Sequence, residues 1–182
     1  MMTMTALPRS RPLVRADLEA MPDDGHRYEL IDGVLIVTPA PALEHQRVVG
    51  RLHLLLSAAT APGIEVILAP FAVALADDTE LQPDLIVART ADFTPRELPG
   101  PPLLAIEVLS PSTRRIDLTL KRDRLEAAGC PAYWCVDPVA MALTAWELED
   151  ERYVQVAHVA GTEVFEATRP FPVTVRPADL KR

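Results

Sequence analysis

A single acidic residue interrupts the most apolar stretch of this chain. Residues 103–109 read Leu-Leu-Ala-Ile-Glu-Val-Leu, which is typical of a buried β-strand, and Glu107 is the one charged member. Burying a carboxylate costs roughly several kcal/mol unless opposite charge or hydrogen bonds compensate it. No basic residue is next to Glu107 in the sequence. The fold must therefore bring a cation to Glu107, either from elsewhere in the chain or from solution.

A second acid begins another apolar strand. Asp84 follows Pro83 in the segment Leu81–Ala88, and Lys121 lies on a predicted helix that follows Glu107. Two carboxylates on neighbouring strands form a site of hard oxygen ligands, which suits Mg²⁺ because this ion binds through one or two carboxylates, waters and substrate phosphate. A nearby lysine can stabilise charge that develops on a phosphate or orient a water molecule. These residues make a metal-dependent phosphodiesterase a candidate function.

The order of the predicted elements indicates an α/β (mixed α+β) fold. Asp32-Gly33 supplies the positive φ angles of a type I′ turn and predicts a β-hairpin over Tyr28–Val37. Apolar residues at helical spacing predict a helix over Leu43–Ala59. A second helix is expected from Ser112 or Thr113 to about Ala128. The other predicted segments are a short helix over 14–21, strands at 64–68, 71–75, 81–88, 103–109 and 133–139, a proline-rich connection over 89–102 and a late β-meander over 142–175.

We therefore expect a central mixed β-sheet in which adjacent strands bring Asp84 and Glu107 together, with both long helices packed on it. The 182 residues suit one domain over residues 13–182 after a flexible tail over 1–12. The net charge of -8 argues against indiscriminate binding to nucleic acid, so phosphate contacts would come from a local basic patch. Cys130 and Cys135 are predicted to be small core residues in a reducing compartment, and a cytoplasmic protein without a membrane segment is expected.

Five segments together resemble one bacterial protein family. They are Tyr28–Gly33 (YELIDG), Gln82–Leu85 (QPDL), Ile106–Thr113 (IEVLSPST), Asp117-Leu118 with Lys121, and Ala128–Pro138 (AGCPAYWCVDP). This set is similar to the restriction endonucleases of the Uma-two family, which is assigned to the PD-(D/E)XK nuclease superfamily. The resemblance covers roughly residues 14–175.

The resemblance implies a restriction-endonuclease-like core and a DNA endonuclease that uses Mg²⁺, with Mn²⁺ as an alternative. By position, Asp84 and Glu107 would bind the metal, and Glu29 would be the additional acid found near the start of the core in many members. The superfamily lysine normally stands two residues after the second acid, but that residue here is Leu109. The resemblance implies that Lys121 from the next helix takes its place.

Each residue also has a structural interpretation without catalysis. Asp84 can be a strand-start cap, and Glu107 can form a buried ion pair with Arg114, Arg115 or Lys121. Lys121 can be a solvated partner of Asp117, since the two are spaced i,i+4. The remaining alternatives are a polar hairpin face for Glu29, a surface or capping role for His45, solvated helix positions for Arg122 and Arg124, and supporting roles around the site for Asp117 and Ser110.

Two other functions compete with the nuclease. One is a non-catalytic module on the same fold that binds nucleic acid or a protein, which the acidic composition and Leu109 favour. The other is an interaction protein. We also predict a homodimer, because cutting both strands of a duplex usually needs two sites, and the late meander with Trp146 and Tyr153 offers a self-complementary surface.

Overall fold

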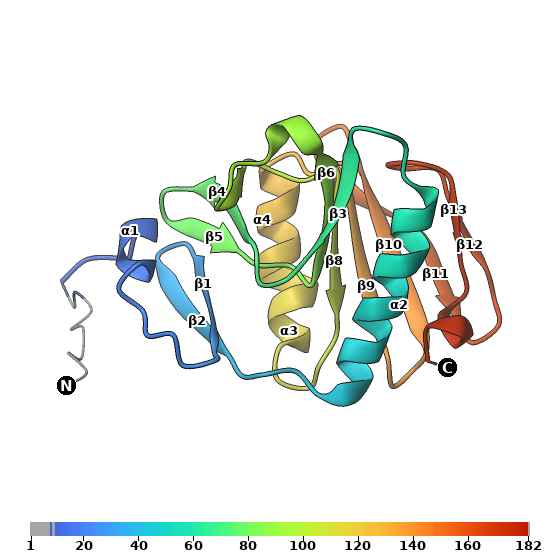
Figure 1. Ribbon diagram of the computed structural model, residues 1–182, viewed down its shortest axis with the longest axis horizontal. Coiled ribbons are helices and arrows are strands. Elements are labelled where there is room, and N and C mark those ends of the chain that lie inside the picture. Colours follow the sequence, from blue (N-terminus) through green and yellow to red (C-terminus); the bar gives the residue numbers. More distant parts are fainter. Residues whose placement is uncertain (1–7, 9, 182) are drawn as a thin grey trace.

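The computed structural model describes residues 8 and 10–181, and its centre is a six-stranded mixed sheet (Figure 1). The strands lie in the order β11-β10-β9-β8-β6-β3. β8 and β9 are parallel, whereas the other neighbouring pairs are antiparallel. The predicted central mixed sheet is thus confirmed. Its strands are β3 (Ile64–Leu68), β6 (Leu85–Arg89), β8 (Leu104–Val108), β9 (Ala132–Asp137), β10 (Ala142–Glu149) and β11 (Arg152–Ala160).

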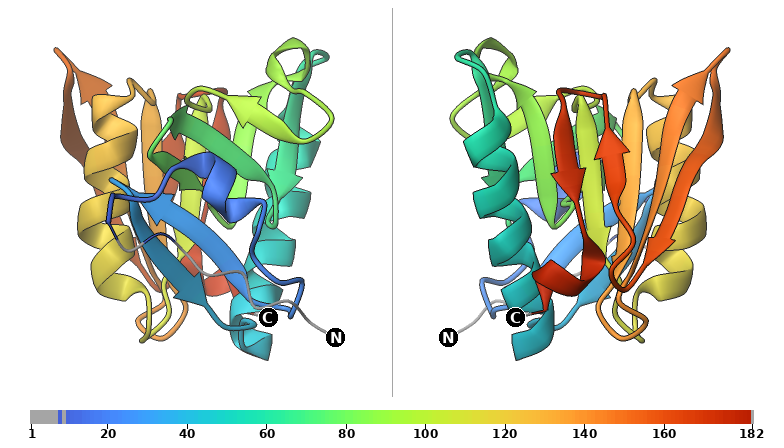
Figure 2. Two further views of the ribbon diagram at one scale, coloured as in Figure 1. Left: turned by 90° about the vertical axis from the view of Figure 1, so that its left-hand side faces the viewer. Right: turned by 90° about the vertical axis from the view of Figure 1, so that its right-hand side faces the viewer.

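Helix α2 (Leu43–Ala59) covers one face of this sheet and has the bounds expected from its periodicity. Its residues Val48, Leu52 and Leu56 are buried against the sheet. A two-stranded sheet of β12 (Phe165–Ala167) and β13 (Val173–Val175) lies on the same side of the molecule as α2 (Figure 2, right). This face of β6 and β8 is therefore occupied by hydrophobic packing and leaves no room for a polar site.

The opposite face of the sheet is covered by the second predicted helix. The structure divides it into α3 (Arg114–Ile116), a π-helical segment η2 (Asp117–Lys121) and α4 (Arg122–Ala127). It ends at Ala127, and Gly129 beyond it has a φ of 81°, which only glycine adopts without strain. Both cysteines are free and buried on this side, as expected for core residues.

A second sheet, β2-β1-β5-β4-β7, lies beside the α3–α4 side of the central sheet (Figures 1 and 2). It contains the predicted hairpin, with positive φ angles of 52° at Asp32 and 74° at Gly33. This separate sheet was not predicted. Its strands are β1 (Arg27–Ile31), β2 (Val34–Thr38), β4 (Ala72–Ala76), β5 (Thr79–Leu81) and β7 (Glu97–Pro99).

Three boundaries differ from the predictions because tertiary pairing overrides local pattern. The predicted strand Leu81–Ala88 is wrong as one element, since residues 82–84 separate β5 in one sheet from β6 in the other. The connection over residues 89–102 contains the 3₁₀ turn η1 (Thr90–Asp92) and β7. The predicted short helix is α1 (Arg15–Leu18). Most of the predicted tail over residues 1–12 lies outside the described residues. Leu13, the first residue of the predicted domain, is buried, and its N–H donates to the carbonyl of Gly33 at 3.0 Å.

Trp146 does not form the surface that was predicted for a dimer. Its side chain is only 8% exposed, and its ring stacks on Tyr133 at a centroid distance of 5.9 Å. Tyr153 stacks on the same ring at 6.2 Å and donates a hydrogen bond to the carbonyl of Cys130 at 2.9 Å. The stacking therefore belongs to the core of one chain. Within residues 8 and 10–181, no helix has the length and apolar character needed to cross a membrane.

Candidate active site

Strand pairing brings the two predicted acids next to each other. β6 and β8 are antiparallel with Leu85 opposite Ile106, so one further step in this register sets Asp84 opposite Glu107. Directly opposed residues of an antiparallel pair project to the same face. The backbone N–H of Val108 also donates to Oδ2 of Asp84 at 2.8 Å, which ties this carboxylate to β8. The predicted juxtaposition is present in the structure.

Asp84 is held by two basic side chains from other elements. Nη1 of Arg27, on β1, donates to Oδ1 at 2.9 Å, and Nε2 of His45, in the first turn of α2, lies 3.0 Å from Oδ2. Burial by itself raises the pKa of Asp84, but the hydrogen bond with His45 and the positive charge of Arg27 hold it below its ordinary value. Asp84 is therefore ionised at neutral pH. Its contacts with Arg27 and His45 go beyond the role of a strand-start cap.

Lys121 is the cation that compensates Glu107. Its Nζ donates to Oε1 of Glu107 at 2.9 Å and lies 2.9 Å from Oε1 of Glu29. Burial lowers the pKa of Lys121, but the charges of Glu107 and Glu29 raise it above its ordinary value, so the ammonium stays protonated. Lys121 is 1% exposed, so the interpretation of this lysine as a solvated helix residue is wrong. The ion pair foreseen as an alternative for Glu107 is formed.

Glu29 completes the arrangement from β1. It is fully buried, so a polar hairpin face is the wrong interpretation for this residue. Its Oε1 also accepts the backbone N–H of Gln82 at 2.7 Å, while within the described chain its Oε2 accepts no hydrogen bond. The two sheets meet here, because β1 supplies Glu29 and the β5–β6 connection supplies Gln82.

Asp117 is the fourth buried acid of the site, and it lies one turn before Lys121. Oδ1 is 3.5 Å from Nζ of Lys121, yet neither carboxyl oxygen accepts a hydrogen bond from a described residue. Burial raises the pKa of Asp117 above its ordinary value, and burial raises that of Glu107 in the same way, while the charge of Lys121 opposes both shifts. These two carboxyl groups are therefore poised to hold a proton or to gain a cation.

We call Glu29, Asp84, Glu107, Asp117, Arg27 and Lys121 the acid cluster. Its four carboxyl groups face two permanent cations, which leaves two negative charges uncompensated when all are ionised. A divalent cation matches this deficit, and carboxylate oxygens are the ligands that Mg²⁺ and Mn²⁺ prefer. Among the described residues, however, no three acids, histidines or cysteines converge on one ready-made metal position. The donor chemistry and charge fit a divalent ion, while Asp84 and Glu107 are held by Arg27 and Lys121.

The other candidate residues lie away from the acid cluster. Arg114 pairs with Asp137, and Arg124 pairs with Asp32 at 2.6 Å. The guanidinium of Arg122 lies 5.8 Å from the centre of the Trp146 ring. The hydroxyl of Ser110 bonds to those of Ser112 and Thr113, at 3.0 and 2.9 Å, and therefore shapes the turn before α3.

Arg27 was not identified from the sequence. Its spacing from Glu29 could have indicated that it joins the site, since residues 27 and 29 of one strand project to the same face. His45 was considered mainly as a capping or surface residue, yet its side chain is only 11% exposed.

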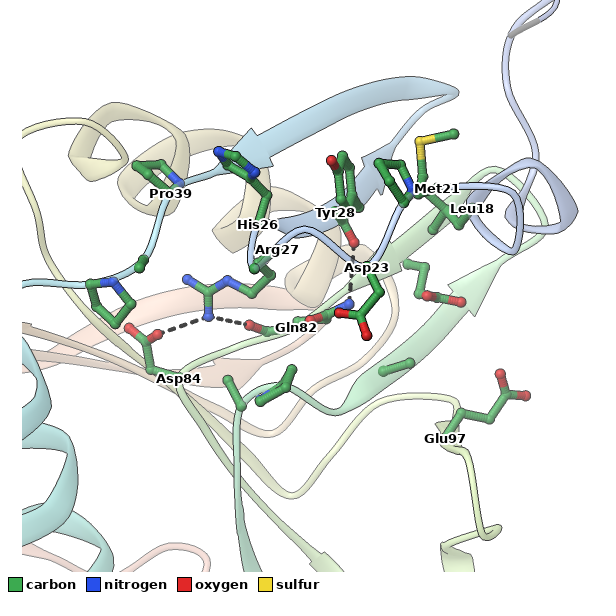
Figure 3. Close-up of a pocket in the computed structure, with 18 of the residues that line it drawn as sticks. Leu18, Met21, Asp23, His26, Arg27, Tyr28, Pro39, Gln82, Asp84 and Glu97 are labelled. Carbon is green, nitrogen blue, oxygen red and sulfur yellow. Dashed lines mark hydrogen bonds and ion pairs between the residues drawn. The ribbon is translucent and has the colours of Figure 1, made fainter. Parts of the chain in front are cut away.

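A cavity of about 800 Å³ opens beside Asp84. Figure 3 shows Arg27 between Asp84 and Gln82 on its wall, where Nη1 bonds to both residues. His45 and Tyr28 also line the cavity, whereas Glu107 and Lys121 lie behind this wall. Asp84 is thus the member of the acid pair that faces the cavity.

The comparisons with other proteins agree with this architecture. A crystal structure titled as that of "a putative nuclease belonging to DUF820" from Anabaena variabilis ATCC 29413 has a TM-score of 0.73 to this chain at 17% identity. The match covers 93% of this chain and 97% of that one, and at this identity it shows a shared nuclease-like fold alone. A search of curated proteins found no match. The family model Uma2, described as "Putative restriction endonuclease", matches residues 15–180, and the chain therefore belongs to the Uma2 family.

Proposed function

We propose that this protein is a metal-dependent DNA endonuclease that hydrolyses phosphodiester bonds with Mg²⁺, or alternatively Mn²⁺. The observation that carries the proposal is the acid cluster, in which adjacent strands hold Asp84 and Glu107 side by side and Lys121 donates to Glu107 at 2.9 Å. Membership of the Uma2 family supports nuclease chemistry. The uncompensated negative charge supports a divalent cation as the missing component.

Asp84 and Glu107 are the residues that would hold the ion. When bound, a divalent ion polarises the phosphate and lowers the pKa of a water ligand. Lys121 keeps its proton because acids surround it, so its positive charge can stabilise negative charge that develops on a phosphate bound beside Glu107. Glu29 positions Lys121, since the two side chains are 2.9 Å apart. Arg27 and His45 orient the carboxylate of Asp84 through its two oxygens.

One observation favours a second candidate, a non-catalytic module that binds nucleic acid or protein. Asp84 and Glu107 are each bound to a cation of the chain itself, Arg27 and Lys121. A site of this kind is already partly neutralised and can be stable without metal. Under this second proposal the acid cluster would be a structural network that joins the two sheets.

A cleavage assay separates the two candidates. Supercoiled plasmid, single-stranded DNA and RNA are incubated with the protein in EDTA, Mg²⁺ or Mn²⁺. The nuclease proposal expects nicking or cutting of DNA that needs the divalent ion and disappears in Glu107→Gln. The matched control is Glu166→Gln, because Glu166 is an exposed residue of β12. Binding of DNA without cleavage in any metal would favour the second candidate.

The homodimer is proposed on separate grounds, and the two free cysteines support the proposed cytoplasmic location. Each chain carries one acid cluster, so cutting both strands of a duplex calls for two copies. The long strand β11 is an edge of the central sheet, and its Val154 and Val156 are 42% and 41% exposed. We propose this edge, in place of the Trp146 surface, as the dimer interface. Sedimentation of the metal-free protein at micromolar concentration should give twice the monomer mass, and a monomeric mass would contradict the dimer.

A further inference from the structure

We infer that the cavity beside Asp84 is a subsite for one unstacked nucleotide whose base carries an exocyclic amino group. This inference rests on the proposed nuclease function and deepens it, since it names the substrate feature that the same site takes. The cavity volume of about 800 Å³ lies in the range of roughly 300–1,000 Å³ that is typical of small-ligand pockets. Enzymes that do chemistry on a nucleobase take that nucleotide out of the stack into a pocket, and a cavity of this size has room for a nucleotide in the same way.

Arg27 provides a place for one phosphate at the inner end of the cavity. Its Nη1 donates to Oδ1 of Asp84 and to the carbonyl of Gln82, both at 2.9 Å. Within residues 8 and 10–181, its Nε and Nη2 donate to no protein group. The side chain is 18% exposed, and it lines the cavity. These remaining N–H groups can donate to the phosphate next to the site.

Gln82 provides an acceptor that awaits a donor. Its Nε2 donates to the carbonyl of Tyr28 at 3.2 Å, which fixes the orientation of the amide. Its Oε1 is buried and accepts no hydrogen bond from the described part of the chain. Buried polar atoms are nearly always paired, so this acceptor calls for a donor, which an N–H of a ligand in the neighbouring cavity can supply. The ring of Tyr28 lines the same cavity and offers a face for stacking a base.

The charge of the cavity wall favours a phosphate at Arg27. Glu19 and Asp23 are exposed acids on this wall, Arg15 is engaged by Glu80 and Glu97, and Arg96 is an exposed cation that also lines the cavity. A phosphate placed beside Glu19 or Asp23 would be repelled. Amino groups of a base would instead find acceptors. Adenine, cytosine and guanine carry an exocyclic amino group, whereas thymine does not.

The test measures the binding of dAMP and dTMP to the metal-free protein by calorimetry in EDTA. The wild-type protein should bind dAMP about tenfold more tightly than dTMP, as expected from one additional hydrogen bond. Gln82→Ala should bring the ratio of the two dissociation constants close to one. The matched control is Gln155→Ala, since Gln155 is exposed on β11, at the far edge of the central sheet, and this variant should keep the wild-type ratio.

Several outcomes overturn the inference. Equal binding of dAMP and dTMP to the wild type does so, as does no binding of either, or an unchanged ratio in Gln82→Ala. If Gln82→Ala does not melt cooperatively, Gln82→Met removes the same acceptor at similar side-chain length. Because the assay needs no metal and no cleavage, its result is independent of nuclease activity. Selective binding without cleavage in any metal would keep the subsite and refute the nuclease, whereas cleavage without selectivity would refute the subsite alone.

Discussion

The most informative perturbation compares the two partners of the buried ion pair, Lys121→Met and Glu107→Gln. Among the described residues, the ammonium of Lys121 is the one that lies near Glu107, Glu29 and Asp117, at distances of 2.9, 2.9 and 3.5 Å. Removing it leaves these three buried acids without the positive charge that they share. Removing the charge of Glu107 leaves Lys121 with two acids still in contact. The structure therefore predicts that Lys121→Met lowers the free energy of unfolding much more than Glu107→Gln does.

The magnitudes follow from burial. Lys121 and Glu107 are each 1% exposed, and removing one member of a buried pair typically costs about 3–5 kcal/mol. We expect that loss for Lys121→Met, which corresponds to a fall in melting temperature of roughly 6–20 °C for a chain of this size. For Glu107→Gln we expect a change within about 1 kcal/mol, because burial already raises the pKa of Glu107 and a neutral amide resembles the protonated acid.

The dependence on pH gives an independent signature. The pKa values of Glu107 and Asp117 are raised in the folded state, so the folded protein binds more protons than the unfolded chain as pH falls. Stability therefore increases on lowering the pH from about 7 towards the ordinary carboxyl pKa of about 4. Without the ammonium of Lys121 this effect should be larger, so Lys121→Met should regain part of its lost stability at pH 5.

Urea unfolding of the three proteins at pH 7 and pH 5, in EDTA, measures these differences. Arg89→Met is the control for removal of a surface cation, because Arg89 is paired only with the exposed Asp92, at 3.6 Å. The reasoning is refuted if Lys121→Met costs less than about 1 kcal/mol, or if Glu107→Gln costs as much as Lys121→Met. A stability difference that does not change between the two pH values would also contradict the assigned charges.

Three further predictions test the metal, the helix and the hairpin. Magnesium should stabilise the wild type by about 2.7 kcal/mol at one hundred times its dissociation constant. In thermal melts, the melting temperature of Asp84→Asn should rise much less with magnesium than that of the wild type, and an equal rise in both would exclude Asp84 as a ligand. Deleting Thr119 should convert the π-helical segment to regular α-helix and leave Lys121 on the same face, because a π-helical turn holds one residue more than an α-helical turn. Cleavage and the helical circular dichroism signal should therefore be retained, and loss of cleavage would show that the π-helical segment itself is needed. Gly33→Ala should destabilise by more than about 1 kcal/mol in urea, because φ is +74° and the added Cβ would lie 2.6 Å from Cβ of Pro12; a neutral effect would show that the turn adapts.

Local pattern determined much of the architecture. The spacing of Val48, Leu52 and Leu56 was sufficient to place α2, because one helical face must bury these side chains wherever the helix packs. Asp32-Gly33 determined the hairpin turn for an equally local reason, the need for positive φ angles. The acids of two apolar strands identified Glu107 and Asp84, and Lys121 was found on the helix that follows. The family resemblance added Glu29 and assigned a role to each residue.

Tertiary structure alone decided how these residues are compensated. Arg27 and His45 reach Asp84 across 57 and 39 residues of sequence, and no local periodicity encodes such a contact. The division of residues 81–88 between two sheets depends on which strands lie beside β5 and β6, since pairing partners rather than propensity settle where a strand ends. The π-helical segment that carries Lys121 was not predictable from local pattern either, because a regular helix satisfies the same sequence locally. The buried charges are neutralised by residues that are far apart in the sequence, so their pairing is known only from the tertiary structure.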